Sequence, residues 1–103
     1  MSIEYTADAA VDIETAVDEL VDRYGPSPAV AFQTRLDSTL TRLEAMPLAY
    51  SLVDPPLVNH PGLRVMPVAK FESRLIFYTP TPTGILVVRV LPAASDWQAA
   101  LGD

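Results

Sequence analysis

Cysteine is absent from this sequence of 103 residues, and histidine occurs once, at His60. Without cysteine the chain forms no disulfide and offers no thiolate to a metal ion, which also fits a reducing compartment. A catalytic triad needs a nucleophile beside a histidine that an acid orients, whereas His60 lies between Asn59 and Pro61 in a proline-rich stretch. We therefore expect no hydrolase of this kind and no metal site, and we interpret His60 as an exposed loop residue.

Glycine and long apolar runs are scarce as well. With only four glycines the sequence contains no glycine-rich phosphate loop, and we expect no cofactor. The apolar run Ile85–Val88 is far shorter than the roughly 20 residues that a helix needs to cross a bilayer. The acidic amino-terminal segment has neither the basic start nor the apolar run of a signal peptide. These features predict a cytoplasmic protein with no membrane partner.

Basic residues are few, and their distribution is uneven. Seven lysines and arginines stand against 13 acids, for a formal net charge of −6. Ten of the acids, but only three of the basic residues, lie within residues 1–54. The acids of residues 8–22 follow one predicted helix, which is typical of a solvated face rather than a cation site. Because nucleic-acid binding depends on basic residues that replace phosphate counterions, the balance disfavours direct nucleic-acid binding and favours a protein partner.

The periodicity of the first half predicts a strand followed by two helices. Residues 2–5 alternate polar and apolar side chains, as a short strand does. Thr6 is then a candidate N-cap for a helix that ends at Gly25-Pro26, with an apolar stripe at Ala10, Ile13, Val17, Leu20 and Tyr24.

A second helix is expected to begin at once and to run to Met46. Ser27 is its predicted N-cap and Pro28 its first residue, and its apolar stripe comprises Ala29, Phe32, Leu36, Leu40 and Leu43. So short a connection predicts an antiparallel helical hairpin.

The second half changes to strand periodicity after a proline-rich loop over residues 47–62. Runs at 63–68, 74–79 and 84–91 predict a three-stranded antiparallel meander. Residues 85–88 are apolar on both faces and should form the central strand, whereas Pro67 belongs at an edge or a bulge. A last helical turn is expected from Ser95-Asp96-Trp97. The sequence thus predicts one α+β domain over residues 1–103.

The basic residues of the predicted sheet are the candidates for binding a target. Arg64, Arg74 and Arg89 fall in strands, and Lys70 falls in a turn. If Arg64 and Arg74 project from the same side, they form a positive patch for a phosphate or for a partner's carboxylates. The alternative, which stays open, is that these arginines form surface ion pairs with Glu72 or Asp96.

Several strings in this order resemble the ParE branch of the RelE/ParE toxin superfamily, over residues 2 to about 97. They are Tyr5-Thr6-Ala7-Asp8-Ala9, Tyr24-Gly25, Leu43-Glu44-Ala45-Met46-Pro47, Gly62-Leu63-Arg64, Arg74-Leu75-Ile76-Phe77-Tyr78 and Val88-Arg89-Val90-Leu91. The resemblance implies a RelE/ParE-like fold and the toxin of a type II toxin–antitoxin pair. It also implies a cognate antitoxin that binds and neutralises the toxin as a hetero-oligomer.

The resemblance implies two alternative modes of action. ParE-like members poison DNA gyrase, and RelE-like members cleave messenger RNA on the ribosome. Arg64 and Arg74 match basic positions of the RelE-like pattern, but residues 91–97 contain no lysine, arginine, histidine or tyrosine. Many ParE-like chains carry a histidine where this chain has Pro92. We therefore expect binding rather than catalysis, and we keep the ribosome-dependent endoribonuclease and a non-toxic protein-interaction domain as alternatives.

Apolar residues near the loop are the candidates for contacting the antitoxin. A helical hairpin on a small sheet leaves grooves and a strand edge for an amphipathic segment. The candidate anchors are Met46, Leu48, Tyr50, Leu52, Leu57 and Trp97. An equally open interpretation is that the first five cover the core, and for Trp97 we favour a role in capping the core over docking a partner.

Overall fold

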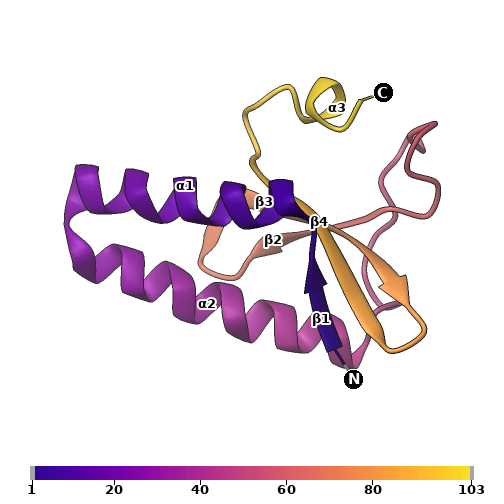
Figure 1. Ribbon diagram of the computed structural model, residues 1–103, viewed down its shortest axis with the longest axis horizontal. Helices are drawn as coiled ribbons and strands as arrows, with labels where there is room; N and C mark the ends of the chain where they lie inside the picture. The colour runs from indigo at the N-terminus through magenta and orange to yellow at the C-terminus, as the bar shows by residue number, and fades with distance from the viewer. Residues whose placement is uncertain (1, 103) are drawn as a thin grey trace.

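The computed structural model describes residues 2–102 as a four-stranded sheet with a helical hairpin on one face (Figure 1). The elements follow in the order β1 (Ser2–Tyr5), α1 (Ala7–Tyr24), α2 (Pro26–Ala45), β2 (Arg64–Val68), β3 (Phe71–Thr81), β4 (Gly84–Pro92) and α3 (Trp97–Ala100). This is the predicted α+β order. Within the described residues, no helix is both long enough and apolar enough to cross a membrane.

The first helix begins where the sequence predicts it. The Oγ1 atom of Thr6 accepts a hydrogen bond from the amide of Ala9 at 3.0 Å and donates one to the carbonyl of Val88 at 2.6 Å. The predicted apolar stripe is wrong at both ends, because Ala10 and Tyr24 are exposed while Ala9 and Ala16 are buried. The two buried alanines let α1 pack closely against the core, and small side chains carry little periodicity signal.

The second helix begins two residues earlier than predicted. Gly25, at φ 87° and ψ −177°, serves as the C-cap of α1 and the N-cap of α2, and Pro26 is the first residue of α2. This backbone conformation is accessible almost only to glycine. Ser27 is therefore not the N-cap, because Gly25 already caps the helix two residues earlier. The predicted buried face of α2 is confirmed, with Thr39 as a buried polar addition.

Thr39 connects α2 to the β2–β3 turn. Its hydroxyl donates to the carbonyl of Arg35 at 2.7 Å and accepts from the amide of Ala69 at 3.1 Å. The turn contains only Ala69 and Lys70, and Lys70 has a φ of 67°. The predicted turn over residues 69–73 was too long, because β3 begins at Phe71, whose ring packs edge-on against Phe32 at 5.4 Å.

The sheet has the strand order β1-β4-β3-β2. The predicted meander over β2, β3 and β4 is confirmed, and β1 adds in parallel to β4. Residues 85–88 accordingly lie in an inner strand. Pro67 lies exposed on the edge strand β2 at a register shift, as expected for a residue without an amide proton. A second register shift in the β3–β4 ladder leaves Val88 as an extra residue in β4.

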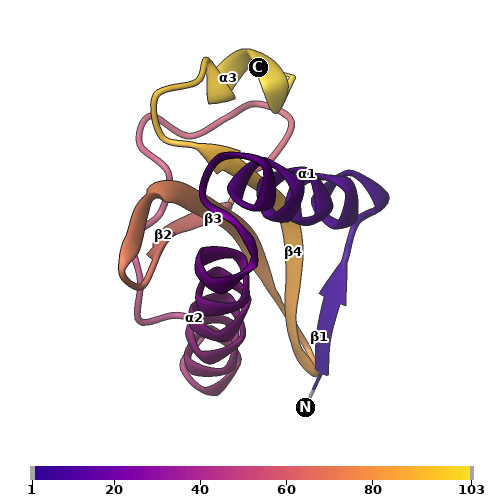
Figure 2. The same ribbon diagram turned by 90° about the vertical axis from the view of Figure 1, so that its left-hand side faces the viewer.

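The two faces of the sheet bury separate clusters of apolar residues. The larger cluster lies between the sheet and the α1–α2 pair and includes Phe32, Leu40, Ile76, Tyr78 and Val87. The smaller cluster lies on the other face, where the loop and the carboxyl-terminal segment cover it, and comprises Val53, Leu57, Leu63, Phe77, Leu91 and Leu101. Figure 2 shows α3 above α1, at the end of the molecule away from α2. Leu101, directly after α3, is the residue that brings this short tail into the core.

Candidate functional site

Arg64 fixes the start of the proline-rich loop to the sheet. Its Nη1 atom donates to the carbonyl oxygen of Tyr50 and, at 3.4 Å, to that of Leu48. Across the ladder it faces Tyr78, whose hydroxyl donates to the carbonyl of Pro47 at 3.1 Å. Burial raises the pKa of Tyr78, while the charge of Arg64 acts in the opposite direction. The Tyr78 hydroxyl and one nitrogen of Arg64 are thus engaged in holding residues 47–50.

The other two arginines form ion pairs with α1. Arg74 contacts Glu19 at 2.6 Å between Nη2 and Oε2. Arg89 forms a two-pronged pair with Asp12, at 2.7 Å from Nε and 2.9 Å from Nη2. The hydrogen bonding of Arg89 to the Asp12 carboxylate raises the pKa of Arg89. Ion pairing was the alternative left open for these arginines, but the acids come from α1 and are not Glu72 or Asp96, because the helical hairpin places α1 over the strands.

Asp12 has a second function at the bulge in β4. Its Oδ2 atom also accepts the amide of Val90 at 3.0 Å. Val90 lies two residues beyond the extra residue Val88, and a carboxylate from α1 is the acceptor for its amide. The Arg89–Asp12 pair therefore positions α1 on the sheet.

The four basic candidates lie at separate places. Arg64 and Arg74 share a face of the sheet, because Arg64 is paired with Tyr78 and Arg74 precedes Tyr78 by four residues in β3. That spacing puts them about 13 Å apart along the strand direction. Lys70 is exposed at the β2–β3 turn, and it forms no ion pair within residues 2–102. Contact of these residues with a target stays a prediction.

The apolar candidates divide into exposed and core residues. Met46, Leu48 and Leu52 are 57%, 69% and 54% exposed. Tyr50 is half-buried against the larger cluster. Leu57 is buried in the smaller cluster, and the ring of Trp97 lies 5.2 Å from that of Phe77. Met46, Leu48 and Leu52 thus remain accessible to a partner, while Leu57 is buried and Trp97 is half-buried against the smaller cluster.

His60 is half-buried and contacts the carboxyl-terminal segment, so the expectation of an exposed loop residue was wrong. Its Nε2 atom lies 3.0 Å from the carbonyl oxygen of Leu101, and the amide nitrogen of Asn59 donates to Gly102 at 2.6 Å. The loop folds back on the tail, which no local pattern in the sequence signals. His60 thus helps to hold Leu101 in the smaller cluster.

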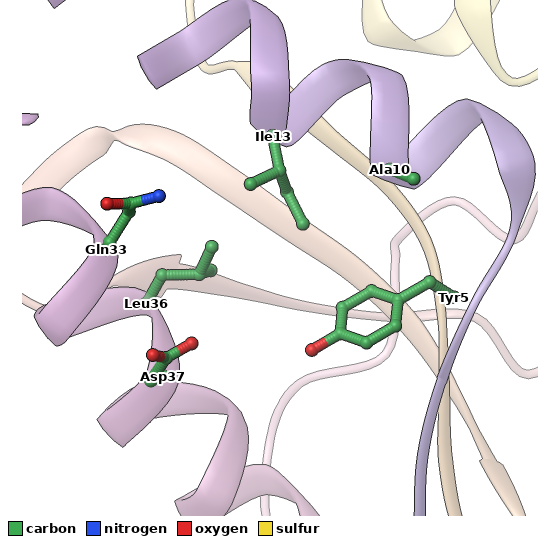
Figure 3. Close-up of a pocket in the computed structure, with 6 residues that line it drawn as sticks. All are labelled: Tyr5, Ala10, Ile13, Gln33, Leu36 and Asp37. Carbon is green, nitrogen blue, oxygen red and sulfur yellow. The ribbon is translucent and has the colours of Figure 1, made fainter.

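A groove of the kind expected beside the helical hairpin lies between the helices and β1, but its lining residues were not among the predicted candidates. It has a volume of about 510 Å³ and is lined by Tyr5, Ala10, Ile13, Gln33, Leu36 and Asp37 (Figure 3). Leu36 and Ile13 form the apolar floor, while Tyr5, Gln33 and Asp37 are exposed. Tyr5 stands at the end of a short predicted strand, but the sequence does not show that it lines a groove. The other lining residues come from α1 and α2.

Comparisons with known proteins agree with this architecture. The family model described as "ParE toxin of type II toxin-antitoxin system, parDE" matches residues 3–97. A solved structure titled "Chromosomal ParDE TA system from P. aeruginosa" is similar, with a TM-score of 0.70 and 18% sequence identity over 89% of this chain and 95% of that chain. No curated protein gave a match. The chain belongs to the ParE toxin family of type II toxin–antitoxin systems.

Proposed function

We propose that this chain is a toxin that inhibits growth by binding a macromolecular target in the cytoplasm, with DNA gyrase as the candidate target. A cognate antitoxin binds and neutralises it in a hetero-oligomer. The observation that carries the proposal is membership of the ParE toxin family over residues 3–97.

The arrangement of the basic residues favours binding over RNA cleavage. Cleavage without a metal needs a base, a proton donor and cations around one phosphate. Arg74 and Arg89 are paired with acids of α1, and Arg64 contacts backbone carbonyls about 13 Å from Arg74. Tyr78, which faces Arg64 across the ladder, is fully buried. These side chains are better placed to stabilise the fold than to surround a scissile phosphate.

Two surfaces suit the antitoxin. The first is the groove lined by Tyr5 and Asp37, beside the strand edge of β1. The second comprises the exposed Met46, Leu48 and Leu52. A disordered tail that orders on binding can cover both, because such segments wrap large surfaces.

The proposal is tested by inducing the chain in cells with and without the protein encoded by the adjacent short reading frame. We expect growth arrest when the chain is induced alone, rescue on co-expression, and co-purification of the two proteins. Sequencing of messenger RNA ends in the arrested cells should show no new cleavage sites within translated messages. New ends would favour the endoribonuclease, and normal growth would favour a non-toxic interaction domain.

A further inference from the structure

The groove between α1, α2 and β1 combines an apolar floor with one anionic end. The floor is formed by Ala10, Ile13 and Leu36, and the polar rim by Tyr5, Gln33 and Asp37. None of the described residues that line it is basic. The two ion pairs of residues 2–102 involve other acids, so neither neutralises Asp37.

Tyr5 and Asp37 lie on opposite sides of the groove, on β1 and α2. Figure 3 shows the Tyr5 hydroxyl pointing across the opening toward the side of α2 that carries Asp37. Burial raises the pKa of Tyr5, and the negative charge of Asp37 raises it further. The phenol therefore keeps its proton at neutral pH, and the carboxylate provides the only formal charge among the lining residues.

The groove opens beside an unpaired strand edge. β1 stands at the end of the sheet and pairs only with β4, so its outer backbone groups are free to accept another strand. Tyr5 is 46% exposed at the carboxyl end of this edge. A peptide can therefore pair with the backbone while alternate side chains enter the groove, which favours a peptide over a small molecule.

We propose that the antitoxin segment that occupies this groove carries an arginine between apolar residues, and that Asp37 and Tyr5 select it. This inference rests on the proposed function. A guanidinium forms two hydrogen bonds with a carboxylate and stacks on an aromatic ring, whereas a lysine ammonium matches this planar geometry poorly. The apolar neighbours of the arginine contact Ile13 and Leu36. The groove thus distinguishes partners by charge as well as by apolar contact.

The experiment uses the full chain and a displayed library of random 16-residue segments. The library is panned separately on the wild type, on Asp37→Lys and on Asp18→Lys, a matched charge reversal at an exposed position of α1 outside the groove. Clones that bind in the groove are recognised because they lose binding to Ala10→Trp, which fills it. Affinities of single clones are then measured on these variants and on Tyr5→Phe and Tyr5→Ala.

We expect groove clones from the wild type to be enriched in arginine at one position flanked by apolar residues, and those from Asp37→Lys to carry Asp or Glu there. An arginine clone should lose about tenfold in affinity on Asp37→Lys and less than about twofold on Asp18→Lys. Tyr5→Phe should bind nearly as well as the wild type, and Tyr5→Ala several-fold more weakly.

Three outcomes would each overturn the proposal. They are groove clones without arginine enrichment, equal affinity of an arginine clone for the wild type and Asp37→Lys, and no clones sensitive to Ala10→Trp. The binding readout is independent of growth arrest, so a chain that proves non-toxic contradicts the proposed function and leaves this result interpretable.

Discussion

At the scale of single residues, the Arg89–Asp12 pair shows how one carboxylate serves two partners. Asp12 is 12% exposed and contacts both the guanidinium of Arg89 and the amide of Val90. Asp12→Ala leaves a charge and a backbone donor unpaired, so we expect a loss of about 2–4 kcal/mol in the free energy of unfolding. Asp12→Asn should lose less, because its amide oxygen can still accept from Val90.

Urea denaturation measures this difference, with Asp18→Ala as the control on the exposed face of α1. The control should change stability by no more than about 0.5 kcal/mol. If Asp12→Ala were equally mild, the pair would not position α1. Neither partnership could be predicted from the sequence, because Asp12 and Arg89 stand 77 positions apart and the acids nearer in sequence to Arg89 offered a simpler pairing.

At the scale of elements, the starts of the two long helices differ. The predicted N-cap of α1 is confirmed, and the predicted N-cap of α2 is wrong. Thr6 accepts the amide of Ala9, whereas Ser27 is exposed inside a helix that has already begun at Pro26. Thr6→Ala should therefore cost about 1–2 kcal/mol, since it also loses the bond to the Val88 carbonyl. Ser27→Ala should stay within about 0.5 kcal/mol. Thermal unfolding of both variants measures these losses of stability. A large loss for Ser27→Ala would indicate that Ser27 caps α2 as predicted.

Most elements could be predicted because their periodicity is local. The buried face of α2 follows from large apolar side chains at helical spacing. Pro67 indicates an edge strand and Pro92 a strand end, because proline has no amide proton to donate to the sheet. The parallel pairing of β1 with β4 could not be predicted, because a strand of four residues carries no signal about its partner. The groove depends on that pairing, since it brings Tyr5 to the same opening as Asp37 of α2.

At the scale of the whole molecule, one sheet connects two apolar clusters that should unfold together. Leu101 is 5% exposed and closes the smaller cluster, while Asn59 and His60 hold the adjoining backbone. Leu101→Ala should lower the free energy of unfolding by about 2–4 kcal/mol without changing the dependence on denaturant. The exposed Gln98→Ala serves as the control. Two separate transitions would show instead that the tail and its cluster unfold independently of the helices.

The central proposal is that this chain acts by binding a target, with DNA gyrase as the candidate. The direct measurement is a supercoiling assay with purified DNA gyrase, relaxed plasmid and increasing amounts of the purified chain. We predict that supercoiled product declines as the chain is added, and that preincubation with the antitoxin restores it. Full supercoiling at a large molar excess of a correctly folded chain would contradict gyrase as the target.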